Sequence, residues 1–87
     1  SANAEDNKQD ESNPRGAELF KKYCALCHGP DGKKGFNGAK DITVSTLLIE
    51  ERIILIREGK GLMTPYKELL SEEDIRAVAE FSLSLNK

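Results

Sequence analysis

The chain lacks several features that would point to common functions. Its 87 residues include no tryptophan, two cysteines, one histidine and one methionine. The longest aliphatic run covers only residues 53–56, far short of the ~20 residues that a membrane-spanning helix needs. Thirteen basic and fifteen acidic side chains nearly cancel, so we expect no positive surface for nucleic acid. A chain of this length forms one domain with a marginal apolar core, so we expect a further stabilising element.

Residues 1–13 differ in composition from the rest of the chain. They carry four acidic residues against Lys8 alone, and their only apolar side chains are Ala2 and Ala4. This is too little apolar surface to offset the entropy lost on ordering. We therefore predict a disordered acidic arm, serving as a tether or left over from expression or processing, followed by one domain at 14–87. No hydrophobic leader precedes the arm, so we expect a mature form or one expressed without its signal.

The first predicted helix begins at Pro14. Asn13 is a favourable N-cap, and proline suits the first helical position because its missing N–H would have no partner there. Apolar residues then recur at helical spacing up to about Cys27. Between residues 28 and 43, five glycines and prolines interrupt any regular element. A loop of this length in so small a domain is expected where the chain wraps a ligand.

Two further helices follow this loop. The composition of residues 46–58 would also allow a buried strand, but charged residues interrupt the apolar ones at a helical interval, and Gly59 offers a C-terminal stop. Ser71, followed by three acidic residues, predicts the N-terminus of a last helix that continues to about Leu85. No second strand candidate exists. The predicted fold class is therefore all-α, with three to four helices and long loops.

The reactive side chains gather in the segment Cys24-Ala25-Leu26-Cys27-His28. It holds both cysteines and the only histidine, in the Cys-x-x-Cys-His order typical of covalent c-type haem attachment. Two thiols at this spacing can each add to a vinyl group of one porphyrin, and the adjacent imidazole can ligate its iron. Burying the porphyrin would contribute on the order of 10 kcal/mol at about 25 cal/mol/Å². We therefore expect the domain to unfold without haem.

Three other interpretations of this motif are less favoured. Structural zinc needs four ligands, whereas only three candidates lie here and no second pair follows. A dithiol redox motif would normally lie in a βαβ unit, which this chain does not predict. A plain structural disulfide is less favoured still. Haem attachment is favoured over all three.

Met63 is the favoured candidate for the second axial ligand of the iron. Lysine, tyrosine and an open position are the alternatives, and a lone methionine often serves only as core filler. Met63, however, lies in a loop bounded by glycine and proline, between Gly59 and Tyr66, rather than on a helix face. We expect the haem pocket to be completed by apolar and aromatic residues, namely Phe36, Leu47, Ile53, Ile56, Leu62 and Tyr66.

Taken together, the motifs resemble the class I c-type cytochromes, most closely the small photosynthetic-type cytochromes of algae and cyanobacteria and their bacterial relatives. The likeness covers about residues 14–86 and is carried by Cys24-x-x-Cys27-His28, Gly59-Lys60-Gly61-x-Met63 and Leu70-Ser71-x-Glu73-Asp74-Ile75. It implies a cytochrome c fold with one haem c bound through Cys24 and Cys27.

The same resemblance implies roles for single residues. His28 Nε2 and Met63 Sδ would ligate the iron, and the Pro30 carbonyl would accept the other ring N–H of His28. Phe20 of the first helix would lie at its crossing with the last helix, where Phe81 approaches closely.

The resemblance also implies an electron carrier rather than an enzyme. Iron with both axial positions filled has no place for a substrate, which leaves one-electron exchange through the exposed porphyrin edge. We expect a respiratory or photosynthetic-type chain outside the cytoplasm, in the bacterial periplasm or at a membrane surface facing it rather than in the thylakoid lumen. The expected partners are redox proteins that dock at the haem edge of a monomer, with no nucleic acid and no membrane span.

Two alternative functions stay open at this point. In the first, Met63 detaches and the haem acts as a catalyst or sensor for peroxide or a diatomic gas. In the second, the domain is a fixed relay module of a larger redox complex, held by the N-terminal arm.

Overall fold

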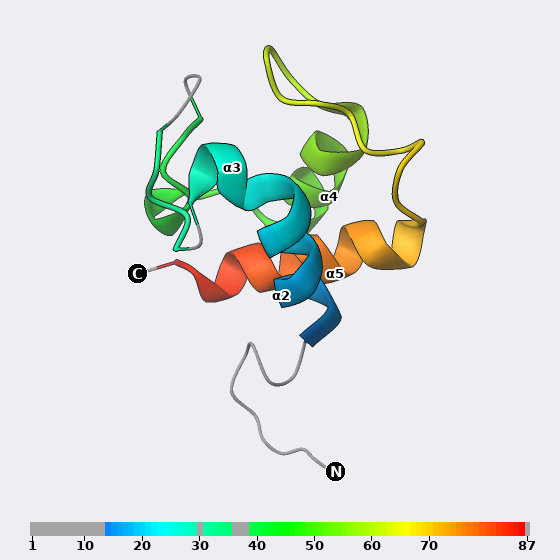
Figure 1. Ribbon diagram of the computed structural model, residues 1–87, viewed down its shortest axis with the longest axis horizontal. Helices are drawn as coiled ribbons and strands as arrows, with labels where there is room; N and C mark the ends of the chain where they lie inside the picture. The colour runs from blue at the N-terminus through cyan, green and yellow to red at the C-terminus, as the bar shows by residue number, and fades with distance from the viewer. Residues whose placement is uncertain (1–13, 30, 36–38, 87) are drawn as a thin grey trace, which may run out of the picture.

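The computed structural model describes residues 14–29, 31–35 and 39–86 (Figure 1). Within these ranges all regular secondary structure is helical, apart from an isolated bridge between Lys60 and Met63. The predicted all-α class is therefore confirmed. The acidic arm expected at 1–13 lies outside the described residues. No helix in the described part is long and apolar enough to cross a membrane.

The first helical segment consists of three consecutive parts. They are α2 (Pro14–Leu19), the π-helical turn η1 (Phe20–Cys24) and α3 (Ala25–His28). The segment ends at Gly29, whose φ of 77° is favourable only for glycine and whose N–H donates to the Ala25 carbonyl at 2.7 Å. A Cβ at Gly29 would lie 2.9 Å from the Cβ of Lys34. The backbone therefore turns away directly after His28, one residue beyond the predicted end.

Helix α4 (Ile49–Glu58) confirms the helical interpretation of the aliphatic run. It begins three residues later than expected, because the preceding backbone is extended at Leu48 and the Leu48 N–H donates to Glu51 Oε1 at 2.7 Å. Between the first segment and α4 lies a single 3₁₀ turn, η3 (Ile42–Val44), within the region predicted as loop. Gly59 follows the last residue of α4, as the sequence predicted.

Helix α5 (Glu72–Ser84) begins as predicted after Ser71, whose Oγ accepts a hydrogen bond from the Asp74 N–H at 3.1 Å. It packs against both α2 and α4 (Figure 1). The Asp74 carboxylate accepts two hydrogen bonds from the Arg15 guanidinium, at 3.1 and 3.0 Å. The first turn of α5 is thereby attached to the beginning of α2.

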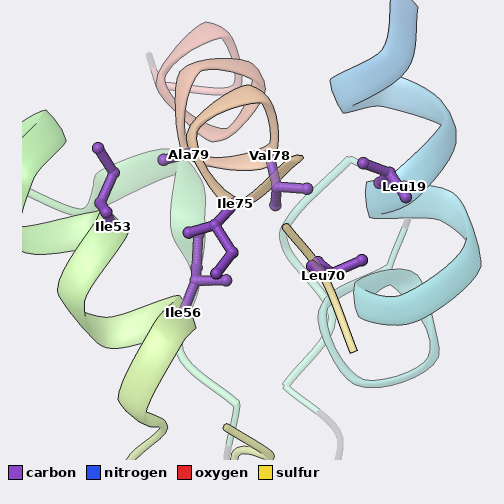
Figure 2. Close-up of a cluster of buried hydrophobic side chains, with 7 residues drawn as sticks. All are labelled: Leu19, Ile53, Ile56, Leu70, Ile75, Val78 and Ala79. Atoms are coloured by element: carbon purple, nitrogen blue, oxygen red, sulfur yellow. The ribbon is translucent and has the colours of Figure 1, made fainter. Parts of the chain in front are cut away.

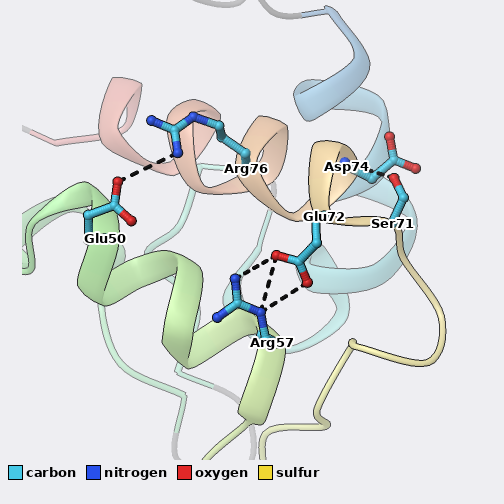
Figure 3. Close-up of polar contacts among 6 residues, drawn as sticks. All are labelled: Glu50, Arg57, Ser71, Glu72, Asp74 and Arg76. Carbon is cyan, nitrogen blue, oxygen red and sulfur yellow. Dashed lines mark hydrogen bonds and ion pairs between the residues drawn. The ribbon is translucent and has the colours of Figure 1, made fainter.

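Two further ion pairs join α5 to α4 (Figure 3). Arg57 contacts both carboxylate oxygens of Glu72, with Nε to Oε2 at 3.0 Å. Arg76 Nη1 lies 3.5 Å from Glu50 Oε2. Because all four side chains are substantially exposed to solvent, these pairs contribute mainly to the orientation of the helices rather than to stability.

The apolar core lies between α2, α4 and α5 (Figure 2). Ile75 and Ala79 of α5 are completely buried at its centre. Next to it, the Phe20 and Phe81 rings meet with their centroids 5.3 Å apart and their planes tilted by 53°, in agreement with the expected crossing of the first and last helices. The core consists of Leu19, Ile53, Ile56, Leu70, Ile75, Val78 and Ala79.

Candidate functional site

A cavity of about 1150 Å³ opens beside the core, between the first helical segment, α4 and the loops that flank α4. Cys24, Cys27, His28 and Met63 all contribute to its wall. The four side chains predicted to bind or attach the cofactor therefore share one cavity. Ligand pockets commonly occupy about 300–1,000 Å³, so a porphyrin-sized group has sufficient space here.

Cys24 and Cys27 lie where the helix changes its type. The π-helical turn η1 ends at Cys24, and α3 begins at the next residue. Such π-helical turns are frequent at functional sites. No disulfide joins the two cysteines. Burial, with a smaller contribution from Cys27, raises the pKa of the Cys24 thiol to about 11, so this thiol carries its proton at neutral pH.

His28 is the last residue of α3, and its ring orientation is fixed from the opposite loop. Its Nδ1 lies 3.1 Å from the carbonyl oxygen of Lys40. Because a carbonyl can only accept, this contact requires the hydrogen to be on Nδ1, which leaves the Nε2 lone pair free for a metal. The acceptor expected from the resemblance was the Pro30 carbonyl. Pro30 lies outside the described residues, so that role stays a prediction.

Met63 is positioned by a tightly folded loop. Its N–H donates to the Lys60 carbonyl at 2.9 Å. A Cβ at Gly59, where φ is 74°, would lie 2.6 Å from the Met63 carbonyl oxygen and 2.8 Å from the Pro65 nitrogen. Only glycine allows this approach, so the residue that ends α4 also shapes the loop that carries the methionine. The half-buried Met63 side chain packs against the core.

The remaining predicted pocket residues fall into three groups. Leu47, Ile56, Leu62 and Tyr66 line the cavity, although Leu62 is 82% exposed and lies at its rim. Phe36 lies outside the described residues. Ile53 is not among the residues that line the cavity and belongs to the core, because its position on α4 turns it toward Ala79 of α5 (Figure 2).

Several cavity residues were not predicted from the sequence. Tyr23 lies directly before the cysteine motif, and its carbonyl accepts a hydrogen bond from the Tyr66 hydroxyl at 3.1 Å. The two rings meet edge to face at 5.6 Å, and burial raises the pKa of Tyr66. Leu55 and Arg52 of α4 also line the cavity. Position next to the motif could have indicated Tyr23, whereas no local pattern indicates a buried arginine.

The structure also bears on the zinc and dithiol interpretations. Among the described residues, no group of three His, Cys, Asp or Glu side chains converges as metal ligands would. The residues around the motif are helical and no strand is present in the described ranges, so the βαβ context of dithiol redox proteins is also missing. The cavity instead offers two thiols, an imidazole and a thioether, which are donors suited to an attached haem.

Comparisons with known proteins identify the family. A family model described as cytochrome c oxidase, cbb3-type, subunit III matches residues 11–81. Cytochrome c6 of Microcystis aeruginosa is 35% identical over 75 residues, covering 79% of this chain and 91% of that protein. Cytochrome c6 of Leptolyngbya boryana is 32% identical over 74 residues, covering 78% and 86%. The chain belongs to the cytochrome c family.

Solved structures agree with this assignment. The KustC0563 c-type cytochrome superimposes with a TM-score of 0.76 at 28% identity, covering 83% of this cytochrome and 98% of that chain. Cytochrome c6C from Synechococcus sp. PCC 7002 gives a TM-score of 0.70 at 31% identity, covering 79% and 90%. The fold is therefore that of a small class I cytochrome c with a single haem. Its cofactor is one covalent haem c, and its general role is that of a c-type cytochrome electron carrier.

Proposed function

We propose that this cytochrome carries single electrons with an iron held between His28 and Met63, in a respiratory or photosynthetic-type chain. The observation that supports this most directly is the shared cavity, because α3 and the loop after Gly59 bring an imidazole and a thioether to the wall that also carries both cysteines. Haem c supplies the one-electron change between ferric and ferrous iron. Cys24 and Cys27 would attach it through thioether bonds.

The protein side chains would restrict the haem to electron exchange. The Lys40 carbonyl contacts the His28 ring at Nδ1, which would leave Nε2 available to ligate the haem iron. Met63 would fill the remaining axial position, which leaves no place for a substrate and favours a carrier over an enzyme. A thioether ligand and the apolar wall formed by Leu55 and Ile56 would raise the reduction potential.

Replacing Met63 tests the axial assignment. In Met63→Ala holoprotein the haem should stay covalently bound, while the reduction potential falls and carbon monoxide binds rapidly to the reduced iron. Leu62→Ala is the matched control, because it removes a neighbouring, exposed side chain from the same loop. If Met63→Ala and Leu62→Ala have the same potential and the same carbon monoxide binding rate, Met63 is not the ligand.

The attachment residues are tested separately. Cys27→Ala and His28→Ala should each prevent maturation of a normal holoprotein, because one removes a thioether bond and the other the first axial ligand. Haem staining after denaturing electrophoresis and the visible spectrum report the two effects. Normal haem content and a normal spectrum in both variants would contradict the proposed attachment.

We further propose that the protein works outside the cytoplasm, in the periplasm or facing it, and docks as a monomer to redox proteins. Leu62, 82% exposed at the cavity rim, supports a docking surface there, since an exposed apolar side chain can be covered by a partner. Lys40 and Lys60 flank the same opening, which favours partners with carboxylates around their own cofactor. Electron-transfer rates that do not depend on salt would contradict the charge contribution.

A further inference from the structure

The side chain of Tyr66 connects the loop that carries Met63, residues 59–66, to the helical segment that carries the cysteine motif. Its hydroxyl donates a hydrogen bond to the Tyr23 carbonyl at 3.1 Å, from 43 residues further along the chain. The two rings also meet edge to face, with their centroids 5.6 Å apart. Tyr23 lies in the π-helical turn η1, directly before Cys24. The hydrogen bond from the Met63 loop therefore ends one residue before the first cysteine of the motif.

The other hydrogen bonds of the Met63 loop run within the loop, to α4 or to the residues just before α5. The Met63 N–H donates to the Lys60 carbonyl at 2.9 Å, and the Tyr66 N–H donates to the Ile56 carbonyl of α4 at 3.0 Å. Among the described residues, no hydrogen bond besides that of the Tyr66 hydroxyl joins the loop to η1 or α3. The backbone thus fixes the loop relative to α4, and a single side chain fixes it relative to the cysteine motif.

This connection matters because the groups expected to bind the haem come from two parts of the fold. Cys24, Cys27 and His28 belong to η1 and α3, whereas Met63 follows α4. Helices α2 and α4 each pack against α5, and the cavity lies between the two parts. A shift of the loop relative to η1 would change the span between His28 and Met63, and the Tyr66 hydrogen bond opposes such a shift.

The surroundings of Tyr66 favour this hydrogen bond. The half-buried ring packs against the apolar core, as Tyr23 and Met63 do. Burial raises the pKa of Tyr66, so the hydroxyl keeps its hydrogen at neutral pH and can donate it. A partly buried tyrosine hydroxyl usually has a hydrogen-bond partner, because leaving it without one costs free energy. Packing and hydrogen bonding therefore hold the ring in the same place.

We propose that Tyr66 is a positioning residue for Met63. Its hydrogen bond to the Tyr23 carbonyl holds the Met63 loop against the segment that attaches the haem, and so keeps the methionine at the distance from His28 that two axial ligands of one iron require. Tyr66 acts through the backbone of the loop and not on the iron itself. The effect on iron ligation rests on the proposed axial role of Met63, whereas the effect on the loop does not.

The test compares Tyr66→Phe holoprotein with the wild type, because phenylalanine keeps the ring contact and removes only the hydroxyl. Amide hydrogen exchange at the Met63 N–H reports opening of the loop. It should become about 2- to 12-fold faster, which is the effect of losing one neutral hydrogen bond. The Ile75 N–H, bonded to the Ser71 carbonyl in α5, is the internal reference and should change less. Carbon monoxide should also bind faster to the reduced haem.

Tyr23→Phe is the matched comparison, because it removes a hydroxyl from the other ring of the pair while the backbone carbonyl that accepts the hydrogen bond stays. Its effect on Met63 exchange should be clearly smaller than that of Tyr66→Phe.

Tyr66→4-aminophenylalanine, which offers an N–H donor in place of the hydroxyl, should restore slow exchange. Equal Met63 exchange in Tyr66→Phe and Tyr23→Phe, or in Tyr66→Phe and the wild type, would overturn the proposal. Faster exchange in Tyr66→Phe with an unchanged carbon monoxide rate would support the role of Tyr66 in holding the loop and contradict Met63 as the ligand, which separates the two proposals.

Discussion

Gly59→Ala should be the most disruptive small substitution in the loop that carries Met63. At φ 74° and ψ 175° the residue occupies a region that is nearly restricted to glycine, with a cost of about 1–3 kcal/mol for other residues. The added methyl group would also lie 2.6 Å from the Met63 carbonyl oxygen and 2.8 Å from the Pro65 nitrogen. Because both contacts are with backbone, the loop must shift, which costs about another 1–3 kcal/mol.

Gly61→Ala provides the matched control in the same loop. Its φ of 59° is also positive, but a Cβ there meets no atom within 4 Å. Only the backbone cost of about 1–2 kcal/mol applies. Gly59→Ala should therefore lower the free energy of unfolding by about 2–6 kcal/mol in total, and by more than Gly61→Ala.

Two measurements on the holoproteins decide this prediction. Urea unfolding gives the free-energy losses, and the rate of carbon monoxide binding to the reduced haem reports whether Met63 holds its proposed position at the iron. We expect rapid binding in Gly59→Ala and slow binding in Gly61→Ala. Equal stabilities and equal rates in the two variants would refute the reasoning that Gly59 shapes the position of Met63 by steric exclusion.

Two further predictions concern the helices around the site. Ile75→Ala should lower the free energy of unfolding by about 2–5 kcal/mol because the side chain is completely buried. Leu83→Ala on the same helix should lower it far less, because Leu83 is 39% exposed. Equal losses in urea unfolding would show that burial does not decide the effect. The hydrogen bond from Arg15 holds the pKa of the Asp74 carboxyl below its usual value. The pair therefore stabilises the fold at neutral pH, and this stabilisation is lost as the pH falls below about 4 and Asp74 is protonated. Arg15→Gln should therefore reduce the slope of unfolding free energy against pH in that range, and an unchanged slope would contradict this role.

The helices were predictable because their signals are local. Pro14 begins the first helix, Gly59 ends α4 and Ser71 caps α5, and each acts through backbone groups within a few residues. The start of α4 was the exception. The sequence predicted that α4 starts at residue 46, but it starts at residue 49. There the Glu51 carboxylate reaches back over one turn and accepts a hydrogen bond from the Leu48 N–H. This hydrogen bond decides the start of the helix more strongly than the apolar pattern does.

The candidate site was predictable only in part, for a related reason. The cysteine motif is a short segment whose spacing follows from the chemistry of attachment, so Cys24, Cys27 and His28 could be selected without a structure. The lining of the cavity depends instead on which side of α4 faces α5. Ile53 and Ile56 both fit one apolar stripe, yet Ile53 lies entirely in the core while Ile56 also borders the cavity. Because one apolar surface of α4 borders both the core and the cavity, hydrophobicity alone does not distinguish core residues from cavity residues.

The burial of Arg52 could not be predicted from the sequence. On α4 it stands between two carboxylates and an aliphatic run, which is the usual setting of a solvated helical arginine. Its burial follows from acceptors far away in the chain, 30 residues ahead at Ser82 and 34 ahead at Asn86. Neither periodicity nor a motif connects these positions. This environment of Arg52 exists only in the assembled fold, where four neutral oxygens accept hydrogen bonds from its guanidinium beside the cavity.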